Sequence, residues 1–129
     1  MPRAKELKIR IENHPGVLGE VAAALAKKKL NLRAAHAWLE GSAGCVRLVA
    51  EKPAVARKAL VAGGWPAEEH EVLEVTLADK PGALAELTAK LGRAGVNIEH
   101  LYVGSAGAAR QVKAFVGVSD LAAALKAAR

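Results

Sequence analysis

The sequence predicts an α+β fold made of two similar units, each with an antiparallel sheet and two helices on one face of that sheet. Three observations lead to this prediction. When the sequence is aligned with itself so that Pro15 lies opposite Pro81, its two halves resemble each other. Each copy begins with alternating apolar and polar residues and continues with apolar residues at helical spacing. Of the 129 residues 52% are hydrophobic but only 3% aromatic, so Ala, Val and Leu must fill the core.

The internal repeat indicates that one structural unit is used twice. With the same shift, identical residues coincide along both copies. The matching pairs are Pro15 and Pro81, Gly16 and Gly82, Leu18 and Leu84, Glu20 and Glu86, Leu25 and Leu91, Asn31 and Asn97, Gly41 and Gly107, and Val46 and Val112. We therefore place the first unit at residues 1–71 and the second at residues 72–129.

Each unit is expected to begin with a strand that has one buried face, because apolar residues recur with a period of two. These residues are Leu7, Ile9 and Ile11 in the first copy and Leu73, Val75 and Leu77 in the second. A turn follows at residues 13–16 and 79–82. Its proline presets φ, and its leading Asn or Asp can bond the backbone two residues on.

A helix follows each turn, because the apolar spacing changes to the 3.6-residue period of an amphipathic helix. The apolar positions are Val17, Leu18, Val21 and Leu25, and then Leu84, Leu87, Leu91 and Ala94. Gly95 stands where the second of these helices should end, which is a normal place for a left-handed cap. Its counterpart is Lys29, which would be strained in that conformation. We expect the first helix to end differently.

Two strands and a second helix complete each unit. Strands are predicted over residues 30–39, 45–51, 96–103 and 111–118, joined by turns at 40–44 and 104–109. The later helices should begin near Pro53 and after Ser119-Asp120. Residues 67–71 can form a fourth strand that continues into the second unit, whereas the second unit lacks this last strand. The order βαββαβ is that of ferredoxin-like folds.

Two segments carry a family resemblance. They are Asn13-His14-Pro15-Gly16-Val17-Leu18 with Leu30-Asn31-Leu32, and Asp79-Lys80-Pro81-Gly82-Ala83-Leu84 with Gly95-Val96-Asn97-Ile98. Both resemble the ACT domain, the regulatory amino-acid-binding module of metabolic enzymes, whose usual pattern is D-x-P-G-x-L and then G-x-N-I. The resemblance covers about residues 7–128, and the chain is similar to small stand-alone proteins made of tandem ACT domains.

The resemblance implies a ligand held between ACT units by the first loop and by the asparagine of the second strand. The ligand-binding residues so implied are Asn13, His14, Gly16, Val17, Leu18 and Asn31, and Asp79, Lys80, Gly82, Ala83, Leu84 and Asn97. It implies a small amino acid as ligand, a homodimer, and a metabolic enzyme as the regulated partner. Asn13 and Lys29 depart from the family pattern, so the two sites need not bind the same ligand.

The residues themselves support this interpretation. A helix that starts after Pro-Gly exposes backbone N–H groups that can bind a carboxylate, and glycine lets the ligand approach closely. Amide or carboxylate oxygens can accept bonds from an ammonium group. The structural alternative is a plain turn, with Asn31 and Asn97 as ordinary polar residues at a strand start. For His36 and His100, either a bulge flips the strand register or the rings face a shared cavity.

A nucleic-acid-binding domain is the alternative function, suggested by a net charge of +6 and a pI near 9.7. The densest run, Lys27 to Lys29, falls at a helix end, where the helix dipole favours cations. RNA-binding sheets of this topology carry exposed aromatic residues on their central strands. Here the central strands offer only Phe115, so the sequence disfavours nucleic acid as a partner.

The sequence gives no support for an enzyme, the other alternative. No Ser or Cys nucleophile stands with a base and an orienting carboxylate at a recognisable spacing, and no catalytic residue, cofactor or metal is expected. Cys45 reads as a small buried strand residue. The N-terminus lacks the apolar centre of a signal peptide, and no stretch approaches the roughly 20 apolar residues that span a bilayer. We expect a cytoplasmic protein without membrane contact.

Overall fold

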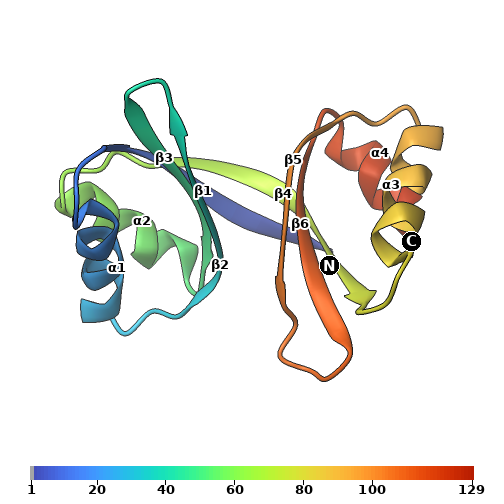
Figure 1. Cartoon of the computed structure of the whole chain (residues 1–129), viewed down its shortest axis with the longest axis horizontal. Coiled ribbons are helices and arrows are strands. Elements are labelled where there is room, and N and C mark those ends of the chain that lie inside the picture. The colour runs from blue at the N-terminus through green and yellow to red at the C-terminus, as the bar shows by residue number, and fades with distance from the viewer. Residues whose placement is uncertain (1) are drawn as a thin grey trace. The chain divides into compact units, whose positions relative to one another are not determined.

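The structure is a computed structural model that describes residues 2–129. Its elements in chain order are β1 (Arg3–Glu12), α1 (Val17–Lys27), β2 (Leu32–Glu40), β3 (Ala43–Ala50), α2 (Pro53–Ala62), β4 (Glu68–Ala78), α3 (Ala83–Arg93), β5 (Ile98–Ser105), β6 (Gln111–Val118) and α4 (Leu121–Ala127). The order strand, helix, strand, strand, helix thus occurs twice (Figure 1). None of the helices in residues 2–129 has the length and apolar character needed to cross a membrane.

The chain divides into two compact units. One consists of Lys5–His70, and the other of residues 2–4 together with Glu71–Arg129. We call them the first and the second unit. The strand order is β2-β3-β1-β4 in the first unit and β1-β4-β6-β5 in the second. Strands β1 and β4 therefore each contribute residues to both units.

The edge strand of the second unit comes from the N-terminal part of the chain. The backbone N–H of Glu74 donates to the carbonyl oxygen of Pro2 at 3.0 Å, and Arg3 forms an ion pair with Glu71 at 3.2 Å. No strand follows α4 in the described residues, as the sequence predicts. The start of β1 thus lies beside β4, where the last strand of a βαββαβ unit belongs.

In the first unit, α1 and α2 lie together on one face of the sheet, as Figure 1 shows. The core between helices and sheet is aliphatic. Its buried members are Leu7, Ile9, Val21, Leu25, Leu30, Val46, Leu48, Ala50, Ala56, Ala59, Leu60 and Ala67, with Ile11, Leu32 and Trp65 packed against them. The predicted α+β class, with helices on one face of an antiparallel sheet, is confirmed.

The second unit repeats this arrangement with α3 and α4 (Figure 1). Its buried core comprises Leu73, Leu87, Leu91, Val96, Ala114, Val116 and Ala124. Helix α4 begins as predicted, because the Asp120 carboxylate accepts a hydrogen bond from the Ala123 N–H at 3.1 Å. Leu18 and Leu84 were predicted among the apolar positions that face the core, and this part of the prediction is wrong. Their side chains are 48% and 41% exposed, so they lie off the core face of their helices.

Helix α1 ends in the same way as α3, so the expectation of a different ending at Lys29 is wrong. Lys29 has φ 57° and Gly95 has φ 73°. In both units a capping bond follows, from Leu30 N–H to the Leu25 carbonyl at 3.3 Å and from Val96 N–H to the Leu91 carbonyl at 2.9 Å. Burial of Leu30 in the core and this bond offset the strain at Lys29.

A bulge resolves the placement of His36 and His100. The register of β2 against β3 shifts between Leu32 and Ala34, and that of β5 against β6 shifts between Ile98 and His100. His36 then pairs with Arg47, which alternates along β3 with core residues. Both histidines therefore lie on the sheet face opposite the helices.

The second hairpin is two residues longer than the first. Leu7 pairs with Leu48, whereas Leu73 pairs with Val116. Leu73 follows Leu7 by 66 positions and Val116 follows Leu48 by 68. The structural counterpart of Val46 is therefore Ala114, and the match of Val46 with Val112 in the sequence repeat is wrong.

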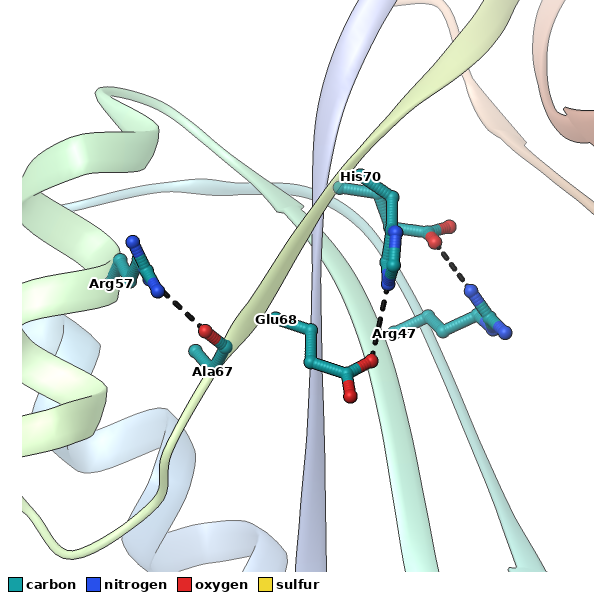
Figure 2. Close-up of polar contacts among 6 residues, drawn as sticks. Arg47, Arg57, Ala67, Glu68 and His70 are labelled. Atoms are coloured by element: carbon teal, nitrogen blue, oxygen red, sulfur yellow. Dashed lines mark hydrogen bonds and ion pairs between the residues drawn. The ribbon is translucent and has the colours of Figure 1, made fainter.

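Polar contacts lie around the beginning of β4, as Figure 2 shows. Arg57 Nε donates to the Ala67 carbonyl oxygen at 3.0 Å. His70 Nε2 lies 3.2 Å from a carboxylate oxygen of Glu68.

On the same sheet, Arg47 pairs with the buried carboxylate of Glu6 at 2.7 Å. This ion pair satisfies a carboxylate that would otherwise be costly to bury.

Candidate functional site

The loops that join the first strand to the first helix have the same conformation in both units. Gly16 has φ 89° and ψ −12°, and Gly82 has φ 90° and ψ −14°. His14 N–H donates to the Glu12 carbonyl at 3.1 Å, and Lys80 N–H donates to the Ala78 carbonyl at 3.0 Å. This left-handed backbone favours glycine, which explains why Gly stands at both positions.

Each of these loops leads to a helix N-terminus that has no side-chain cap. Gly16 caps α1 and Gly82 caps α3, and no side chain of the described residues bonds to either cap. A Cβ added at either glycine would meet no heavy atom within 4 Å. The N–H of Val17 and that of Ala83 donate to the carbonyl oxygens of His14 and Lys80 at 3.4 Å. The N–H groups of the next residues of α1 and α3 are therefore the ones that a ligand can reach, and the helix dipole favours an anionic ligand.

Asn31 and Asn97 tie the start of the second strand to the segment after the third. Asn31 N–H donates to Glu51 Oε1 at 3.0 Å, and its carbonyl accepts from Glu51 N–H at 3.0 Å. Asn97 makes the equivalent pair with Ser119, at 3.0 and 2.9 Å. These contacts use only the backbone of the two asparagines. Both residues are exposed, so their amides lie at the surface.

The loop and the asparagine of one unit lie at opposite ends of the same helix. Helix α1 has 11 residues between Gly16 and the segment that leads to Asn31. At 1.5 Å per residue, this separates the two by about 16 Å. Helix α3, also of 11 residues, separates Gly82 from Asn97 in the same way. One small ligand cannot touch both groups of a single unit.

The structure also places two of the candidate residues in a cleft of the second unit. Lys80 and Ala83 line a cavity of about 270 Å³ between β4, α3 and the end of α4. Leu77 and the buried Leu87 form its apolar part, and Glu86 and Lys90 bring charge to it. The repeat and the motif gave no signal for this cleft, because it depends on how helix and strand pack.

Comparisons with known proteins bear on the family and the fold. Residues 72–128 match the family model of the ACT domain. The second unit is an ACT domain. No curated protein matches the chain.

Solved structures extend the likeness over both units. The protein BT0572 from Bacteroides thetaiotaomicron is 28% identical, with 98% of this chain and 86% of that one covered and a TM-score of 0.89. The regulatory subunit of aspartate kinase from Thermus thermophilus is 19% identical over 98% of this chain and 91% of that one, with a TM-score of 0.70. The corresponding subunit from Thermus flavus is also 19% identical, over 99% and 91%, with a TM-score of 0.67. At such identities the two subunits share the fold with this chain.

The aromatic residues on the open sheet face of the ACT domain are not placed to stack on bases. Phe115 is 1% exposed and Tyr102 is 9% exposed. Their rings stack on each other with centroids 5.6 Å apart. RNA-binding sheets of this topology use exposed rings at such positions, so these two rings of the second unit do not form a platform for bases.

Cys45 is not an activated nucleophile. It is buried, and its Sγ donates to a Glu40 carboxylate oxygen at 3.2 Å. Burial, and then the hydrogen bond to Glu40, raise the pKa of the Cys45 thiol. The thiol therefore stays protonated near neutral pH.

Within residues 2–129, no three His, Cys, Asp or Glu side chains are grouped so as to hold a metal ion.

Proposed function

We propose that the protein is a non-catalytic sensor of a small amino acid, which binds between ACT units through the Pro-Gly loops. The observation that supports this most is the pair of loops with the same backbone conformation, each with a left-handed glycine before a helix N-terminus that has no side-chain cap. The ligand's α-carboxylate accepts hydrogen bonds from the N–H groups of the first helical turn that have no carbonyl partner. Its ammonium group binds oxygens of Asp79 or Asn13 in the loop, or of Asn31 or Asn97.

The two halves of this site come from different units. Because a helix of about 16 Å separates Gly82 from Asn97, a ligand held by both types of residue must bridge two ACT units. Such a ligand favours one arrangement of units over another and so shifts the equilibrium between them. A coupling of about 1 to 3 kcal/mol is typical of such regulation.

The arrangement that responds to the ligand is that of a homodimer or of a complex with a metabolic enzyme. The regulatory subunits of aspartate kinase from the two Thermus species are folded like this chain. We propose that this protein acts in a similar manner, as a separate regulatory chain in the cytoplasm. Its side chains bind and position the ligand, and none of them carries out a reaction on it.

A thermal-shift screen of the common amino acids tests the proposal. A ligand that binds only the native state stabilises it by RT ln(1 + [L]/Kd), about 2.7 kcal/mol at a concentration of 100 Kd. At least one amino acid should raise Tm in the low millimolar range. If none does so, the proposed function is wrong.

A further inference from the structure

The cleft of the second unit has the size of an amino acid. Its volume is about 270 Å³, slightly less than the range of roughly 300 to 1,000 Å³ typical of sites for drug-sized molecules. It begins at the Pro-Gly loop, at Lys80, and continues along α3 to Lys90. A ligand bound at the loop can therefore extend a side chain into it.

The two units differ at the mouth of this cleft. Ala83, the first residue of α3, corresponds to Val17 in α1. Val17 is buried, whereas Ala83 is half-buried and lines the cavity. The smaller side chain leaves room in the second unit that a valine would fill.

Three charged groups of the cleft have no ion-pair partner within the described part of the chain. These are Lys80, Glu86 and Lys90. Glu86 and Lys90 are four residues apart on α3, a spacing at which helical residues often pair, yet they do not. A carboxylate and two ammonium groups thus remain available beside an apolar surface made by Leu77, Ala83 and Leu87.

We propose that this cleft binds the apolar side chain of the amino-acid ligand, with the ligand's charged groups held at its mouth. The ligand's carboxylate binds the N–H groups at the start of α3, where the charges of Lys80 and Lys90 add to the positive potential, and Glu86 joins Asp79 in holding the ammonium group. The inference rests on the proposed function and adds to it a specificity pocket formed by one unit alone. It follows that an apolar side chain of the size of valine or leucine is selected over glycine, aspartate and lysine.

Isothermal titration of the full chain with L-valine, L-leucine, glycine, L-aspartate and L-lysine tests this inference. Valine or leucine should bind at least about tenfold more tightly than the other three, a ratio equivalent to about 1.4 kcal/mol. Lys90→Met should weaken binding about tenfold, whereas Lys126→Met on α4, outside the cleft, should not. Ala83→Leu should have the same effect by filling the cleft, with Ala85→Leu as its control.

The outcomes separate the two proposals. Amino-acid binding that is unchanged in Lys90→Met and Ala83→Leu would overturn the cleft and leave the sensor function intact. Glycine binding as tightly as valine would overturn it as well. If no amino acid binds the unmodified protein, both proposals fail. Lys90 is only half-buried, so Lys90→Met keeps the test valid even if Ala83→Leu does not fold.

Discussion

The N–H of Glu74 donates a hydrogen bond to the carbonyl of Pro2, 72 residues earlier in the chain, at 3.0 Å. Together with the ion pair of Arg3 and Glu71, this contact makes the first residues of β1 the edge of the second unit. The second unit is therefore built from two separate segments of the chain. Contacts of such long sequence separation slow folding, because the loop-closure entropy must be overcome before they form.

Removal of residues 1–4 should therefore destabilise the second unit. The loss includes the backbone hydrogen bond between Glu74 and Pro2 and the exposed ion pair between Arg3 and Glu71, together about 1 to 2 kcal/mol of unfolding free energy. Urea denaturation measures this difference in unfolding free energy. Pro2→Ala keeps the accepting carbonyl and serves as the control. A truncated chain as stable as the full one would show that this edge contributes nothing.

Lys29→Gly should stabilise the protein by about 0.5 to 1 kcal/mol. Lys29 has a positive φ of 57°, a conformation that costs a residue with a Cβ about 1 to 2 kcal/mol, and glycine recovers most of this despite its greater freedom in the unfolded state. Gly95→Lys is the reciprocal variant and should lower stability. The midpoint of urea unfolding measures the stability of both variants. A less stable Lys29→Gly would mean that the lysine side chain contributes more than its strain costs.

The extent to which the sequence predicted the fold follows from what each pattern encodes. Alternation and helical spacing depend on burial along one element, so β1 and α3 could be placed from Leu7 and Leu91 without the structure. The ending of α1 could not, because packing of Leu30 overrides the intrinsic preference of Lys29. The cleft of the second unit, and the pairing of the first residues of β1 with β4, could not be predicted either, because both arise from contacts between segments far apart in the sequence.

Arg47→Met should lower stability by about 3 kcal/mol. Glu6 is fully buried, and Arg47 is its ion-pair partner at 2.7 Å. A buried carboxylate that loses its cationic partner typically costs 3 to 5 kcal/mol. The double variant Glu6→Leu with Arg47→Met should regain much of the loss, because no charge then stays buried. If thermal unfolding shows the single and double variants to be equally stable, the ion pair is not what offsets the burial of Glu6.

Gly82→Asp should abolish the thermal stabilisation by the amino acid. The new carboxylate occupies the space before the N-terminus of α3, where the ligand's own carboxylate binds, and repels it. Gly107→Asp is a matched control, because Gly107 also has a positive φ, 76°, and open space around its Cα but lies in the turn between β5 and β6. A ligand-induced shift in Tm that survives in Gly82→Asp would make the second loop a purely structural turn.

Calorimetric titration of the unmodified protein with each common amino acid tests the sensor function most directly. The account predicts saturable binding of at least one amino acid in the micromolar to low millimolar range, with no more than two molecules per chain because there are two loops. No measurable heat with any amino acid up to several millimolar, at more than one temperature, would contradict it.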